Sequence, residues 1–246
     1  MNKSLIVFAT ILLLTTPYKS LAVDKSNKNC TSDTVLWVNS INYQLPCRYI
    51  QGSLPTIINP DLQKEFVNRL HSVMIKQGLF PAFGQDGLCN AGATDLCSKV
   101  DLAKNQKLII DLDTSILQAS SDFVSIRVDV PFFFMPSAHP STAGLFFNFN
   151  PKTGKVIDGL EGLSTKQQDH LINQVVKVLE SREIDETAAS AQGNTLKDKV
   201  KGLLSGHVGF SSTEAIFVFW RYEIAPGSAG NQVVRIPFNR FVNTND

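Results

Sequence analysis

Apolar and polar residues alternate along several stretches of the chain, which is the period expected of half-buried strands. The clearest stretch runs from Val124 to Phe132, where every second residue is apolar and the residues between are mostly polar. The same pattern covers residues 35–45 and 108–112, and apolar runs at 145–149, 216–224 and 233–238 predict three more strands. Turn-rich connectors such as residues 119–122 indicate antiparallel hairpins.

Three other stretches have helical spacing and recognisable ends. Asn59 and Pro60 supply a cap and a first helical position, and the helix that they begin is expected to end at Gly78. Ser164 and Gln167 form a capping box for a second helix. A short third helix is expected over residues 196–204. The first two helices carry apolar stripes formed by Leu62, Phe66, Leu70, Val73 and Met74 and by Leu171, Val175, Val178 and Leu179.

Helices and strands interleave without a regular strand–helix–strand rhythm, which favours the α+β class. We expect a twisted antiparallel sheet with about three helices packed mainly on one face. Residues 78–104 lack periodicity and read as an irregular insertion, and the acidic, small and polar stretch 183–193 reads as a mobile linker.

The first residues predict export. Lys3 precedes an apolar stretch from Leu5 to Leu14, and Ser20-Leu21-Ala22 is a small-x-small cleavage site, so residues 1–22 read as a signal peptide. The apolar stretch is too short for a permanent membrane anchor. We therefore expect an exported protein without a membrane anchor, in the periplasm or outside the cell.

Charge and length limit the possible partners and the number of domains. Cleavage after Ala22 would remove Lys3 and Lys19, leaving 21 basic against 22 acidic residues, so no nucleic-acid partner is expected. The remaining 224 residues allow one large domain or two packed halves. We expect an N-terminal half over 23–105 and a C-terminal half over 106–246, packed as one unit in a monomer.

Four cysteines, Cys30, Cys47, Cys89 and Cys97, all lie in the first half. In an exported chain two disulfides are expected. Three pairings are possible, and Cys30–Cys47 with Cys89–Cys97 is favoured because each closes a short loop. No two cysteines have zinc-site spacing, so no metal is expected.

Four short motifs follow one another along the second half. They are Ala138-His139-Pro140-Ser141-Thr142, the turn Phe147 to Lys155, Arg221-Tyr222-Glu223-Ile224-Ala225-Pro226, and Val234-Arg235-Ile236-Pro237-Phe238. In this order they resemble the extracytoplasmic domain shared by RsiV-type lysozyme-sensing anti-sigma factors and PdaC-type peptidoglycan deacetylases. The resemblance spans residues 124–241 and weakens over 35–118.

The resemblance implies a role in recognition outside the cytoplasm. The deacetylases use a separate catalytic domain with paired histidines, and the four histidines here, His71, His139, His170 and His207, are isolated. Neither a transmembrane segment nor a sigma-binding part is recognisable. We expect a non-catalytic, cofactor-free binding protein for a lysozyme-type muramidase or a peptidoglycan fragment. The alternative is a secreted hydrolase or virulence-type exoprotein whose active site is assembled in space.

The candidate binding residues are His139, Tyr222, Glu223, Pro226 and Gly227. His139 could bind a ligand or only hold its turn. Tyr222 and Glu223 could offer stacking and a charged acceptor at a loop, or could be a core aromatic and a solvated charge. Where the related domains commonly have an aromatic after the Ala-Pro pair, this chain has Gly227.

The positions of the cysteines predict which disulfide bonds form. Non-reducing mass spectrometry of the exported chain should find no free thiol and should link Cys30 to Cys47 and Cys89 to Cys97. A peptide joining Cys47 to Cys89 would exclude this pairing.

Overall fold

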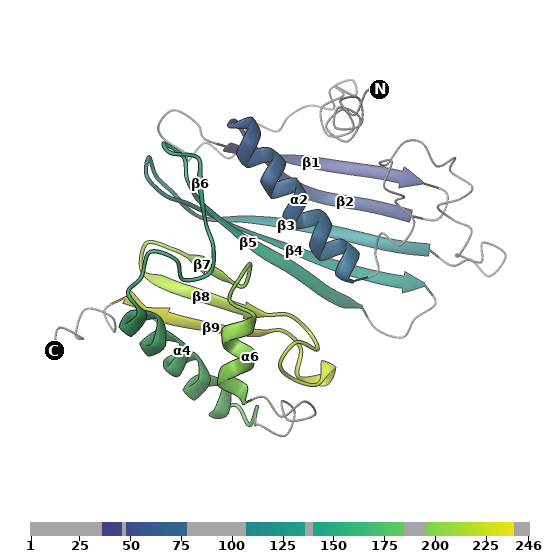
Figure 1. Ribbon diagram of the computed structural model, residues 1–246. Helices are drawn as coiled ribbons and strands as arrows, with labels where there is room; N and C mark the ends of the chain where they lie inside the picture. Colours follow the sequence, from purple (N-terminus) through teal and green to yellow (C-terminus); the bar gives the residue numbers. More distant parts are fainter. Residues whose placement is uncertain (1–35, 46–47, 78–106, 136–139, 185–194, 239–246) are drawn as a thin grey trace, which may run out of the picture.

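The computed structural model describes residues 36–45, 48–77, 107–135, 140–184 and 195–238. These residues form two sheets and three α-helices, shown in Figure 1. The six-stranded sheet contains β1 (Leu36–Leu45), β2 (Arg48–Ile57), β3 (Lys107–Ala119), β4 (Val124–Met135), β5 (Ser141–Asn150) and β6 (Lys155–Ile157). The three-stranded sheet contains β7 (Val208–Phe210), β8 (Glu214–Phe219) and β9 (Gln232–Pro237). The predicted α+β class is confirmed.

The strands of the larger sheet follow chain order, and their pairs are antiparallel except for β2 with β3. That pair is parallel because the chain makes a long crossover, which includes α2 (Pro60–Lys76), before it returns at β3. The expectation of an antiparallel sheet is therefore corrected at this one pair.

Helix α2 covers one face of the larger sheet (Figure 1). Its start is fixed by Asn59, whose side chain accepts hydrogen bonds from the backbone of Asp61 and Leu62, as the sequence predicted. The ring of Phe66 meets that of Phe147 on β5 at 5.6 Å, edge to face. The core between helix and sheet includes Leu62, Leu70, Met74, Ile110, Val128 and Phe149.

Helices α4 (Thr165–Glu180) and α6 (Leu196–Gly202) pack against the three-stranded sheet (Figure 1). The predicted capping box at α4 is present, with Ser164 and Gln167 bonded reciprocally, and Thr195 and Asp198 form a second one at α6. One face of β8 enters this second core through Ala215, Phe217 and Phe219.

The other face of β8 packs on the larger sheet, on the side opposite α2. Ile216 and Val218 of β8, with Trp220 just after it, form a cluster with Phe146, which neighbours Phe147 in β5 and therefore points to the opposite face. Gly144 makes room for the indole, since a Cβ there would lie 2.7 Å from the Trp220 ring and 2.4 Å from the Val128 carbonyl. Within the described ranges, each sheet has its helices on one face, and the other faces of the two sheets meet.

A buried polar network fixes the register of this junction. The Ser125 hydroxyl donates to Asn148 Oδ1 at 2.7 Å, and Asn148 Nδ2 donates to the Val208 carbonyl at 2.8 Å. The Phe210 N–H then donates to Ser125 Oγ at 3.0 Å. Ser125 is fully buried and Asn148 is 3% exposed, so these bonds replace contacts with water.

The sequence patterns located most elements but not their arrangement. Strands β2, β6 and β7 were not expected, one sheet was expected where two are present, and the strand expected over 216–224 ends at Phe219. The four cysteines, the signal segment 1–22, the insertion 78–104 and the linker residues 185–193 lie outside the described residues. Within the described ranges no helix is long and apolar enough to cross a membrane.

The Asn148 network makes a stability prediction. Asn148→Leu leaves the buried Val208 carbonyl without its side-chain donor and the buried Ser125 hydroxyl without its acceptor, so the free energy of unfolding should fall by about 2–4 kcal/mol. Urea denaturation measures the change, and Asn173→Leu on the exposed face of α4 is the matched control. Equal stability of the two variants would show that the network does not hold the sheets together.

Candidate functional site

The candidate site is the β8–β9 loop, residues 220–231, which leaves the small sheet at Trp220 and returns at Gln232. Its first turn is closed by two bonds between the same residues. The Glu223 N–H donates to the Trp220 carbonyl at 3.1 Å, and the Trp220 N–H donates to Glu223 Oε2 at 2.6 Å. This turn ends the strand before Tyr222, which is why the strand is shorter than its apolar pattern suggested.

Tyr222 has a backbone conformation that is rare for a bulky residue. Its φ is 71°, in the left-handed region, and its side chain is 68% exposed. Strain of this kind is about 1–3 kcal/mol and persists only where the surroundings determine the conformation. The turn therefore holds an aromatic ring out of the core and into solvent.

The Tyr222 ring rests on the loop itself. A Cβ placed at Gly227 would lie 2.2 Å from the ring, so the ring occupies the space into which a side chain at position 227 would project. The Arg221 guanidinium lies 5.5 Å from the ring centroid. The space that an aromatic side chain at position 227 would occupy is therefore filled by the Tyr222 ring.

Arg221 ties the loop to the larger sheet. Its Nε donates to the Gly227 carbonyl at 2.7 Å, and its Nη1 donates to the Pro140 carbonyl, just before β5, at 2.6 Å. Its backbone N–H is bonded to Asn231 Oδ1 at 3.0 Å. Three hydrogen bonds through one residue therefore hold the loop in place.

His207 holds Glu223 from the side of β7. Its Nε2 lies 2.9 and 3.0 Å from the two Glu223 carboxylate oxygens, and its Nδ1 lies 2.9 Å from the Ser205 carbonyl. Both nitrogens face acceptors, so both contacts are hydrogen bonds only when each nitrogen carries a hydrogen. The ring also packs edge-on against Trp220 at 4.8 Å.

Trp220 extends this set of hydrogen bonds to the larger sheet. Its indole N–H donates to Asp129 Oδ1 at 3.2 Å, and Arg127 Nη2 donates to the same oxygen at 2.9 Å. These groups are less than one quarter exposed. Side chains from β4, the β7 entry and the β8–β9 loop therefore meet around one indole.

The binding residues proposed from the sequence differ in their exposure and their contacts. Tyr222 is exposed, Glu223 is occupied by internal hydrogen bonds, Pro226 is exposed at the start of the 3-10 turn η3 (Gly227–Ala229), and Gly227 lies beneath Tyr222. His139 lies outside the described residues. His207 and Arg221 were missed as parts of this site, since no spacing signal links them to residue 223 or 140.

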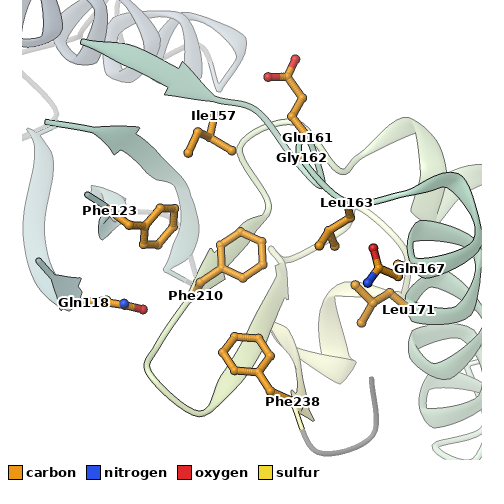
Figure 2. A pocket seen from close by; sticks show the side chains of 10 residues that line it. All are labelled: Gln118, Phe123, Ile157, Glu161, Gly162, Leu163, Gln167, Leu171, Phe210 and Phe238. Carbon is orange, nitrogen blue, oxygen red and sulfur yellow. The ribbon is translucent and has the colours of Figure 1, made fainter. Parts of the chain in front are cut away.

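A second feature is an apolar hollow of about 440 Å³ at the opposite end of the small sheet (Figure 2). Phe123, Phe210 and Phe238 approach it from three different strands or strand ends, together with Leu163 from the loop before α4. Figure 2 shows these side chains directed toward a common space. No group of three or more His, Cys, Asp or Glu side chains suited to a metal occurs among the described residues.

Comparison with known proteins supports the fold and a family match for part of the chain. Residues 161–239 match the sequence model of a family described as a protein of unknown function, DUF3298. This segment lies inside the region that carried the resemblance in the sequence. No curated protein matches the chain.

Two solved structures are similar over most of the chain. A DUF3298 family member from Bacteroides fragilis has 13% identity and a TM-score of 0.50, with 85% of this chain and 92% of that chain covered. A DUF3298 family protein from Pseudomonas aeruginosa has 16% identity and a TM-score of 0.49, with 85% and 93% covered. At 13% identity, the similarity to the Bacteroides fragilis protein shows the fold and not a function.

The His207–Glu223 contact makes a prediction about the loop. His207→Leu removes the donor to a half-buried carboxylate and should lower the free energy of unfolding by about 1–3 kcal/mol. It should also speed hydrogen exchange at the Trp220 amide, whose acceptor is Glu223. In His207→Gln the side-chain amide can still donate to Glu223, so most of both effects should disappear. Identical exchange in the two variants would mean that His207 does not position the turn.

Proposed function

We propose that this protein is an exported, non-catalytic binding protein that recognises its ligand through the β8–β9 loop. The proposal places it in the periplasm or outside the cell, as a monomer that needs no cofactor. Its proposed ligands are a lysozyme-type muramidase or a peptidoglycan fragment. The choice of ligands rests on the resemblance to RsiV-type and PdaC-type domains.

One observation carries the proposal: Tyr222 is the most exposed of the large hydrophobic side chains described and lies on strained backbone. The turn at φ 71° does not need a tyrosine in order to form, since glycine or asparagine fits there with less strain. Outliers of this kind concentrate at ligand-binding positions. Exposed tyrosine on a rigid loop is also a common anchor of binding surfaces.

The setting of the ring supports recognition rather than chemistry. One side of Tyr222 is backed by Gly227, and its immediate neighbour Arg221 is bonded to two backbone carbonyls. An aromatic platform of this kind offers apolar contact to a sugar ring or to a side chain of a protein partner. The alternative hydrolase would need titratable groups converging on a substrate pocket, and its candidate His139 remains to be tested by substitution.

The decisive variant is Tyr222→Gly. Glycine fits φ 71°, so relief of strain should offset its greater freedom in the unfolded chain, and the free energy of unfolding should change by less than about 1 kcal/mol. Binding should weaken at least tenfold, measured by biolayer interferometry against an immobilised lysozyme-type muramidase and soluble peptidoglycan fragments. The exposed Ile75→Ala on α2 is the control and should bind like the wild type.

Gly227→Ala tests the placement of the ring without removing it. Its Cβ would displace the Tyr222 ring, and position 227 is not among the glycines with positive φ, so the backbone tolerates alanine. Weaker binding is expected in this variant as well. Wild-type affinity in both loop variants would reject the loop as the binding surface. Loss of a measurable hydrolytic activity in a His139 variant would favour the enzyme instead.

A further inference from the structure

The apolar hollow lies where three parts of the fold meet, and the β8–β9 loop is at the other end of the small sheet. The β3–β4 hairpin contributes Gln118 and Phe123, and the segment from β6 to α4 contributes Ile157, Glu161 and Leu163 (Figure 2). Strand β7 and the end of β9 contribute Phe210 and Phe238. Its volume of about 440 Å³ falls within the range of small-molecule sites, about 300–1,000 Å³.

The walls of the hollow are fixed by contacts outside it. Phe210 is held through its N–H, which donates to Ser125, and its ring meets that of Phe123 edge to face at 5.8 Å. The Phe123 N–H donates to Ser120 Oγ, which fixes the hairpin turn. Gln167 is held by the capping box of α4. The hollow is therefore formed in advance, because none of these contacts requires a ligand.

Two polar groups at the hollow remain available. The Gln118 amide makes no hydrogen bond with any residue that the structure describes. The Glu161 side chain has one long contact, 3.5 Å from the Asp158 N–H, and is exposed. Among the ten residues that line the hollow, Glu161 carries the only charge, and none is Lys, Arg or His.

We propose that this hollow binds a small amphipathic molecule with an apolar ring or short alkyl body and an uncharged or cationic polar group. The phenylalanine and leucine side chains would cover the apolar body, and Gln118 would bond the polar group. An anionic head such as a fatty-acid carboxylate is disfavoured because none of the lining residues is a cation that could offset its desolvation. Glu161, exposed at the rim with its carboxylate directed away from the phenylalanines in Figure 2, adds only a weak repulsion and a weak preference for a cation. This site goes beyond the proposed function and does not depend on it.

Two naphthalene probes of matched shape test whether the hollow disfavours an anionic ligand. N-phenyl-1-naphthylamine is uncharged, and its 8-sulfonate is an anion; both fluoresce more strongly in apolar surroundings. In titrations of the full chain, the uncharged probe should bind saturably with one site, and the sulfonate should bind at least tenfold more weakly. Equal affinity for the two probes, or no saturable binding of the uncharged one, overturns the proposal.

Two variants locate the site. Leu163→Trp fills the hollow without removing a wall and should abolish binding of the uncharged probe, with circular dichroism as the check on folding. Glu161→Lys replaces an exposed charge and should bring the affinity for the sulfonate to within threefold of that for the uncharged probe. Glu180→Lys, at the far end of α4, is the control for a change in net charge and should leave the tenfold preference intact.

Other occupants give different outcomes. If the uncharged probe binds only to a chain that ends at Phe238, residues 239–246 compete for the hollow, and the proposal of a separate ligand is wrong. If Leu163→Trp stays folded and binds the probe as the wild type does, the probe sits elsewhere, and the assignment fails. If Glu161→Lys leaves the preference unchanged, Glu161 does not select the ligand.

Discussion

The satisfied polar contact between the two sheets is the constraint on which the rest of this structure depends. Strand β7 has three residues and pairs with β8 on one side, so its other edge would otherwise face the larger sheet with unpaired backbone groups. Ser125 and Asn148 bond those groups from β4 and β5. A shift of either sheet by one residue would break these bonds and leave polar groups buried.

This junction positions both candidate sites. At one end of β7, His207 precedes the strand and holds Glu223, whose carboxylate closes the turn that carries Tyr222. At the other end, Phe210 is fixed by its bond to Ser125 and forms one wall of the apolar hollow. The larger sheet therefore acts as the rigid support from which a small sheet presents a loop at one end and a hollow at the other.

The strained backbone at Tyr222 is maintained because the residues on both sides of it are held by packing and hydrogen bonds. Trp220 is 2% exposed and fits over Gly144, Ile224 and Ala225 return at once to the second core, and Arg221 is bonded at both the loop and Pro140. With its neighbours fixed on both sides, residue 222 has to adopt the left-handed conformation whichever side chain it carries. The exposure of the ring follows from this backbone geometry.

The sequence by itself determined the elements whose signals are local. Alternation located β1, β3 and β4, and apolar runs located β5, β8 and β9, because a strand pattern involves only neighbouring residues. Helix caps are equally local, and Asn59, Ser164 and Gln167 located the starts of two helices. The sequence also pointed to the loop containing Tyr222. Only the tertiary structure decided that the strands form two sheets, that Glu223 faces inward to His207, and that Tyr222 occupies the space above Gly227. These outcomes depend on contacts between residues far apart in the chain, for which no spacing rule exists.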